Sequence, residues 1–257
     1  MNIYEFIGVL IGDGYIRHNS KRRVYQIEIA GNVDEDYEYF IKISEFVQKI
    51  TSRKPTIRIK KEKTWKSLRL EINNKNFIEY LFRLGLPEGN KTFTISIPEK
   101  FLDWKYSRHI IRGILETDGC IYFSKSKKIE YPSYPRIEIK TSSKKLKSQI
   151  MEILNKKGFK VYCRKCENTY SLTLSGEKML KKWIDEIGLS NKRNISKYDF
   201  WKKKGFYIPH ISLKSRLETC ADGTAANAVG CNPTIQGFES PSALFIIKNG
   251  FTKIQKE

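Results

Sequence analysis

The stretch Phe6–Ile16, FIGVLIGDGYI, has a second copy at Ile111–Ile121, IRGILETDGCI. Each copy is an apolar run with helical spacing that is closed by Asp-Gly. Aligning the two copies superposes Asp13 on Asp118, a shift of 105 residues. A sequence repeat with so long a period is stronger evidence for the overall architecture than the helix or strand propensity of any single segment. The chain therefore contains a duplicated unit, and we expect two similar halves.

The segments that follow the two copies also correspond. Residues 25–29 (YQIEI) and 136–140 (RIEIK) alternate between apolar and polar side chains, which predicts antiparallel strands with one solvated face. Helical spacing follows over 34–50, with Asp34 as the expected cap, and over 143–157, which Gly158 ends. Each half then closes with a similar phrase, LGLP before Lys91 and IGLS before Lys192.

These patterns predict an α+β fold of two pseudo-symmetric lobes. Each lobe should run helix, two strands, helix, two strands, helix, with a saddle-shaped antiparallel sheet whose second face stays open. We place the first lobe at residues 1–104 and the second at 105–215, packed through the two repeated helices. Residues 216–257 differ in composition, and we expect a flexible tail without an assigned function.

Charge and composition narrow the class of partner. The 48 Lys and Arg residues against 28 Asp and Glu residues leave a net charge of +20, which indicates a polyanionic partner such as nucleic acid. The tail holds equal numbers of acidic and basic side chains, so the whole excess lies in residues 1–215. No apolar run approaches the roughly 20 residues that cross a bilayer. Five cysteines, an odd number, argue against a disulfide framework and for a reducing intracellular compartment: cytoplasm, nucleoid or an organelle.

Basic side chains recur on the predicted open faces of both sheets. A twisted two-stranded ribbon fits the major groove of duplex DNA, where long polar side chains reach base edges. Two such surfaces would read two half-sites. The predicted DNA-binding residues are Arg17, Lys21, Arg22, Gln26, Arg58, Lys60, Lys66, Arg69, Lys125, Arg136, Lys140, Arg164 and Lys165.

Small residues stand four apart in each repeated helix, Gly8 with Gly12 and Gly113 with Thr117. A face without bulk lets another helix approach closely, so the two copies should pack against each other and bring the following aspartates together. Asp-Gly on its own commonly marks a turn, but duplication at matching positions favours chemistry. Two carboxylates beside a phosphate backbone require a divalent cation such as Mg²⁺, which predicts phosphodiester hydrolysis.

Over roughly residues 1–205 the chain resembles the LAGLIDADG homing endonucleases in their single-chain form, with both motifs in one polypeptide. The resemblance implies that Asp13 and Asp118 bind Mg²⁺, with Mn²⁺ or Ca²⁺ as substitutes, and that the carbonyls of Gly12 and Thr117 contribute. It also implies further catalytic residues, which are Glu28 and Glu138 on the second strand of each lobe, Lys91, and Lys192 as its counterpart.

The second copy departs from the family at Arg112, which stands inside an apolar helix. We expect this side chain either to face outward or to find an acidic partner such as Glu116, four residues on.

We therefore expect a monomeric, site-specific endonuclease that cuts both strands of double-stranded DNA. The ends of the chain, Met1 and Gln255 to Glu257, lack splicing nucleophiles, which favours an intron-encoded or free-standing protein over an intact intein. An RNA maturase that binds its own intron RNA is the alternative, and a DNA-binding regulator is a third. Neither the maturase nor the regulator would need the two aspartates.

Overall fold

The computed structural model describes residues 1–61, 66–125 and 130–221. In the first lobe the order is α1 (Ile3–Ile11), β1 (Gly14–Asn19), β2 (Val24–Asn32), α2 (Val33–Thr51), β3 (Thr56–Lys61), β4 (Lys66–Ile72) and α3 (Lys75–Arg83). A short 3₁₀ turn, η1 (Glu99–Phe101), precedes the second lobe. That lobe contains α4 (Trp104–Asp118), β5 (Gly119–Ser124), β6 (Tyr134–Thr141), α5 (Lys144–Lys156), β7 (Tyr162–Cys166), β8 (Thr169–Ser175) and α6 (Glu177–Glu186). Two helices follow, α7 (Lys192–Lys204) and α8 (Leu213–Ala221).

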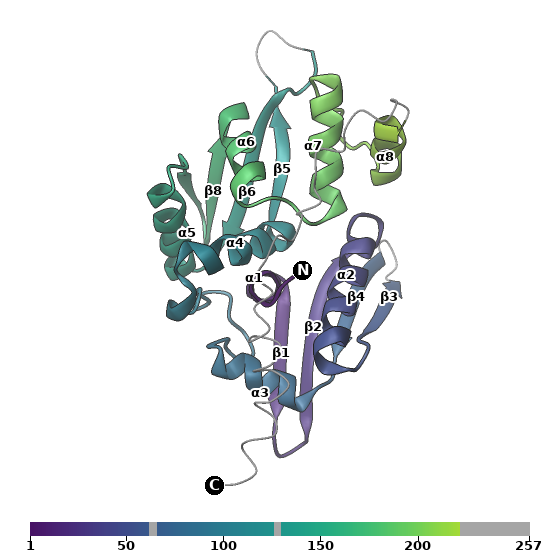
Figure 1. The fold of residues 1–257 in the computed structure, drawn as a ribbon, viewed down its shortest axis with the longest axis vertical. Coiled ribbons are helices and arrows are strands. Elements are labelled where there is room, and N and C mark those ends of the chain that lie inside the picture. Colours follow the sequence, from purple (N-terminus) through teal and green to yellow (C-terminus); the bar gives the residue numbers. More distant parts are fainter. Residues whose placement is uncertain (62–65, 126–129, 222–257) are drawn as a thin grey trace.

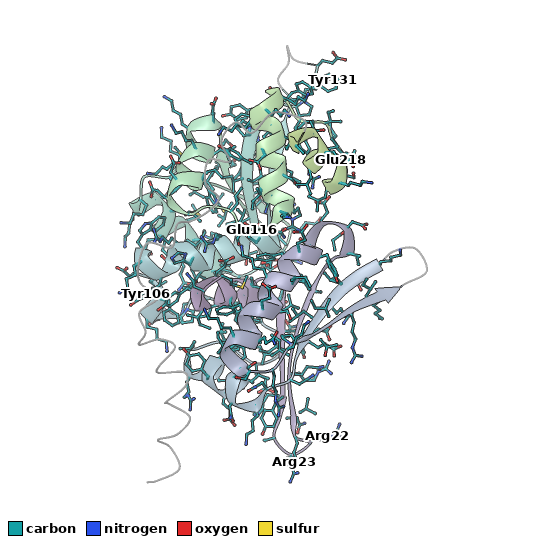
Figure 2. The ribbon with its side chains drawn as sticks, turned by 45° about the vertical axis from the view of Figure 1, so that its right-hand side comes forward. Arg22, Arg23, Tyr106, Glu116, Tyr131 and Glu218 are labelled. Atoms are coloured by element: carbon teal, nitrogen blue, oxygen red, sulfur yellow. The ribbon has the colours of Figure 1, made fainter. Side chains whose placement is uncertain are left out.

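The two sheets have the same topology, which confirms the predicted duplication. Each is antiparallel and four-stranded, with the orders β1-β2-β4-β3 and β5-β6-β8-β7. The repeated helices α1 and α4 pack together at the centre, and the β1-β2 and β5-β6 hairpins point to opposite ends of the molecule (Figure 1). Arg22 and Arg23 mark the first of these ends and Tyr131 the other (Figure 2).

Alternation along the strands sorts side chains between a covered and an open face. Ile27 and Ile29 of β2 are fully buried, as are Leu68 and Leu70 of β4, and in the second sheet Ile139 and Leu172 repeat the pattern. Burying these branched side chains under helices supplies the main favourable free energy of each lobe, roughly 1.5–3 kcal/mol for each fully buried side chain. The opposite face of each sheet stays open.

Side chains at the ends of the preceding segments cap α5 and α2. The Ser143 hydroxyl caps α5 by accepting the backbone N–H of Leu146. The predicted cap of α2, Asp34, is wrong by two residues. The side chain of Asn32 accepts the N–H groups of Asp34 and Glu35 instead, because Asn32 ends β2 in extended backbone and the helix begins directly after it.

A buried ion pair joins the two repeated helices. Arg112 Nη2 of α4 lies 2.7 Å from Glu5 Oε2 of α1, and the Glu5 side chain is only 1 % exposed. Burial alone would raise the pKa of Glu5, but Arg112 and the hydroxyl of Ser190 outweigh it and the pKa is lowered. Arg112 therefore has an acidic partner, as expected, but this partner is Glu5 and not Glu116. Glu116 lies near the middle of the molecule (Figure 2) and accepts hydrogen bonds from the Ser190 N–H at 2.6 Å and Asn194 Nδ2 at 2.7 Å.

The two C-terminal helices were not predicted, and they tie the lobes together. Figure 1 shows α7 alongside β5, with α8 beyond it. Asn194 of α7 accepts the N–H of Ile121, so the helix covers the edge of β5. Arg216 of α8 is 1 % exposed and bonds Glu35 of the first lobe. The predicted flexible tail is thus wrong for residues 216–221, which are helical, while 222–257 lie outside the described residues. In the part of the chain that is described, no helix is long and apolar enough to span a membrane.

Candidate metal centre and DNA interface

The site begins where α1 and α4 end, because the two helices approach to backbone contact. A Cβ atom added to Gly8 would lie 2.1 Å from the carbonyl oxygen of Ile110 and 2.9 Å from the Cα of Gly113. A Cβ added to Gly113 would lie 2.2 Å from the carbonyl oxygen of Glu5. No side chain larger than hydrogen fits at either position. The small residues therefore set the distance between the helices.

One turn further on, the same approach brings the two Asp-Gly segments together. A Cβ added to Gly12 would lie 2.1 Å from Thr117 Oγ1 and 3.4 Å from Asp118 Oδ2. Both aspartate side chains reach solvent, while protein on their other sides displaces water. This burial, together with the charge of Asp13, raises the pKa of Asp118 to about 7 against the opposing effect of Lys91. Burial and Asp36 raise the pKa of Asp13, opposed by Arg193 and Lys91.

Lys91 lies at the same point, as the sequence predicted. Its Nζ donates to the carbonyl oxygens of Ile11 at 2.9 Å and Gly12 at 2.8 Å, the last carbonyls of α1. Burial lowers the pKa of the ammonium to about 8, although Asp118 and Asp13 act in the opposite direction. An ammonium has three N–H donors, so one remains for an oxygen in front of the carboxylates.

In the second lobe the matching position belongs to Arg193. Its Nη2 donates to the carbonyl oxygens of Glu116 at 2.8 Å and Gly119 at 3.4 Å, which places a cation at the end of α4 as Lys91 does at the end of α1. Asp36 of the first lobe holds the guanidinium, with 3.3 Å between Arg193 Nη1 and Asp36 Oδ1. Asn191 also donates to Asp36, at 2.7 Å. Each lobe thus supplies a cation, and the second is anchored by the first lobe.

Lys192, the predicted counterpart of Lys91, does not take that place. Its Nζ lies 2.5 Å from Glu38 Oε2, and both side chains are about half exposed. Fewer residues separate Gly188 from Lys192 than separate Gly85 from Lys91. Aligning the LGLP and IGLS segments by the lysine that follows each therefore pairs Lys91 with Lys192, although Arg193 makes the corresponding contacts. The guanidinium contacts of Arg193 could not be read from the sequence.

The two glutamates predicted to lie near the metal have other partners. Arg69 Nη1 donates to Glu28 Oε1, and the Ser171 hydroxyl donates to Glu138 Oε1. Lys140 Nζ lies 3.7 Å from Glu138 Oε2. Among the described residues, neither glutamate is hydrogen-bonded to an aspartate of the pair. Both do lie on the open faces, opposite Tyr15 and Cys120 in strand register.

The donor set fits a hard divalent cation bound together with a substrate. Burial raises the pKa of both carboxylates despite the opposing charges of Lys91 and, at Asp13, of Arg193, so the negative charge of the pair is not fully compensated. The carbonyl of Gly12 already accepts from Lys91 and has one lone pair left. Within the described residues no group of three or more His, Cys, Asp or Glu side chains could enclose a metal. Mg²⁺ is commonly held by one or two carboxylates with waters and substrate phosphates completing its shell, which suits such a set.

Strand register decides which predicted DNA-binding residues share an open face. Arg17 pairs with Gln26, and Arg58 with Arg69, on the face of Glu28, with Lys60 two residues beyond Arg58. In the second sheet Arg136, Lys140 and Arg164 lie on the face of Glu138. The exposed residues Lys21, Arg22 and Lys125 lie in or beside the hairpin turns.

Two of the predicted residues fall on the wrong face. Lys66 is two residues before the buried Leu68 and so shares its covered face. Lys165 is the neighbour of Arg164 and pairs with Tyr170, so it also lies on the covered face. Several remaining cations are paired with acids on the open face, with 3.5 Å between Arg58 Nη2 and Glu71 Oε2 as an example. DNA would have to displace such partners.

A family model described as the LAGLIDADG DNA endonuclease family matches residues 4–181. The chain is 26% identical over 207 residues to the replication factor C small subunit of Methanocaldococcus jannaschii. That alignment covers 75% of the chain and 10% of the relative, so the chain spans about a tenth of the length of the curated relative it matches.

Two solved structures share the fold. The homing endonuclease I-WcaI bound to its DNA recognition sequence gives a TM-score of 0.53 at 14% identity, covering 73% of this chain and 81% of that one. I-DmoI in complex with DNA and Mn gives a TM-score of 0.50 at 18% identity, covering 73% and 96%. At such identities the likeness establishes the two-lobe architecture alone.

Proposed function

The chain belongs to the LAGLIDADG DNA endonuclease family, and from this premise we propose that it cuts both strands of a specific DNA duplex by metal-assisted hydrolysis. The observation that carries the proposal is the meeting of Asp13 and Asp118 at the ends of two helices packed through Gly8 and Gly113. Two open sheet faces flank this meeting point, one in each lobe. A duplex lying along both faces would pass over the carboxylates.

Asp13 and Asp118 would hold Mg²⁺ between them, with the free lone pair of the Gly12 carbonyl and the carbonyl of Thr117 as further donors. When bound, the cation lowers the pKa of a water and neutralises charge on the scissile phosphate. Mn²⁺ and Ca²⁺ have the same preference for oxygen donors and are the other candidates.

Lys91 contributes positive charge on the first-lobe side. Two of its N–H groups bond the end of α1, and the third can donate to a phosphate oxygen or to the attacking water. Fixed donors aimed at developing charge stabilise a transition state without reorganisation.

On the second-lobe side Arg193 supplies the fixed positive charge in our proposal. The groups at Nη1 and Nη2 are committed to Asp36 and to the end of α4, so the guanidinium holds the backbone around Asp118 in place. The two sides of the centre are therefore chemically unequal.

Cleavage assays with Asp13→Asn and Asp118→Asn test the proposal. A library of duplex sequences incubated with the parent chain and Mg²⁺ should yield one cleaved sequence class, and chelation of the metal should stop cleavage. Each Asn variant should lose cleavage by at least about 1000-fold, because one of the two carboxylate ligands of the metal is gone, while binding to the selected duplex in Ca²⁺ changes little.

Cleavage that persists in both variants would refute the assignment of the carboxylates. Binding to RNA with no cleavage of any duplex would favour the maturase alternative instead. The DNA flanking the reading frame, joined without the insert, is the first duplex to test for an intron-encoded enzyme.

A further inference from the structure

One lysine of α7 lies in a pocket between the lobes and has no role in the proposed chemistry. Lys197 stands four residues after Arg193, on the same side of the helix. The pocket has a volume of about 670 Å³, and its walls include Asn32 and Glu35 from the first lobe and Tyr122 from the second. The chain between α7 and α8 closes it through Tyr207 and Ile211. The pocket thus spans both lobes at the edge of β5.

The ammonium of Lys197 is part-buried and unpaired. Across residues 1–61, 66–125 and 130–221, no carboxylate or other acceptor lies within bonding distance of it. Burial lowers its pKa, and Arg193 and Arg216 add to that effect, while Cys120 and Glu35 act in the opposite direction. Two acids, Asp34 and Glu35, also line the pocket. The Glu35 carboxylate is bonded by Arg216, which also donates from Nε to the Ser196 hydroxyl at 2.9 Å. A charge that is partly removed from water and has no partner is unfavourable until an anion arrives.

The location of Lys197 connects it to the centre formed by the aspartates. The thiol of Cys120 is close to Lys197, and Cys120 stands two residues after Asp118 at the start of β5. In strand register Cys120 lies opposite Glu138, on the open face of the second sheet. Arg193 bonds the end of α4, and Lys197 follows one helical turn further away. Arg193 and Lys197 therefore lie one after the other along α7, with Arg193 nearer to Asp118 and both at the edge of the open face.

We propose that Lys197 binds a backbone phosphate of the DNA strand that lies over Asp118. The inference rests on the proposed function, since it assumes that a duplex lies along the open faces. A phosphate oxygen would supply the missing partner, and a lysine acts as a compact point charge toward phosphate. Such a contact fixes the register of the strand over Asp118 and carries no sequence information.

Fluorescence anisotropy with a labelled duplex of mixed sequence, in Ca²⁺ and over a range of KCl concentrations, tests this. Lys197→Met keeps the aliphatic stem and removes the charge. Lys204→Met is the matched control, because Lys204 is an exposed lysine of the same helix outside the pocket. We expect Lys197→Met to weaken binding several-fold and to reduce the slope of log affinity against log salt by about one unit, with Lys204→Met and Lys197→Arg close to the parent.

Thermal unfolding of the free protein separates this role from a structural one. Removing an unpaired, part-buried charge should leave Tm unchanged or raise it, so a fall in Tm for Lys197→Met would overturn the proposal. Equal slopes for Lys197→Met and Lys204→Met in a parent that binds DNA would overturn it as well. Stabilisation of the parent by inorganic phosphate without any loss of DNA affinity in Lys197→Met would assign the pocket to a free anion instead. A parent that binds no duplex would remove the proposed function itself.

Discussion

At the scale of single residues, Arg193 and Lys192 are neighbours in sequence, but we expect only Arg193 to matter for cleavage. Arg193 bonds the end of α4 and Asp36, whereas Lys192 forms an exposed pair with Glu38. We expect Arg193→Met to slow cleavage about 100-fold, because the backbone that positions Asp118 loses its anchor. Lys192→Met should change stability by less than about 1 kcal/mol and leave the rate near that of the parent. Single-turnover cleavage of each strand is the measurement, and equal effects of the two substitutions would contradict the assignment.

Glu116 predicts a pH dependence of stability. Burial raises its pKa from the ordinary 4.5 to about 7, against hydrogen bonds from Ser190 and Asn194. Because the folded protein holds this proton more tightly than the unfolded chain does, the contribution of Glu116 stabilises the fold at low pH and declines as pH rises from about 4.5 to 7. Glu116→Gln should remove that decline. Denaturant unfolding at the two ends of this window checks the prediction, and an unchanged pH profile in the variant would contradict it.

At the scale of elements, the contact between α1 and α4 reverses a common rule. Replacing a helical glycine by alanine usually stabilises a helix by about 1 kcal/mol. Gly8→Ala or Gly113→Ala should instead destabilise the protein by about 1–3 kcal/mol or more, because the added carbon would overlap backbone of the partner helix. Glu45→Ala on the exposed surface of α2 is the control. Chemical denaturation measures all three, and a gain in stability at Gly8 would mean that the helices are further apart.

The elements also show what the sequence could and could not predict. The order of helices and strands in both lobes and the pairing of α1 with α4 followed from the duplicated motif, because small residues at helical spacing and alternating strands are local patterns. The partner of Arg112 did not follow, because Glu5 is distant in sequence and meets it only when the helices pack. Arg193 was missed for the same reason. The faces of Lys66 and Lys165 could have been read from strand alternation alone.

At the scale of the whole molecule, α8 joins the lobes through one buried cation. Arg216 donates to the carbonyl of Ile211 at 2.7 Å and bonds Glu35 of the first lobe. Arg216→Met would leave Glu35 without its partner, and we expect a loss of about 3 kcal/mol in unfolding free energy. Lys214→Met is the control on the same helix, since Lys214 only pairs with exposed Glu218 at 3.8 Å. A loss equal to that of the control would show that α8 does not hold the lobes.

The ion pair between Glu5 and Arg112 also determines which halves can associate. In the duplicated pattern the position of Arg112 corresponds to Ile7 in the first copy. Two first lobes joined through their own helices would therefore bury two carboxylates against isoleucine, at a cost of several kcal/mol. The first lobe can therefore pack against the second lobe but not against another copy of itself. An engineered homodimer of the N-terminal half would need an arginine in place of Ile7 before it could assemble.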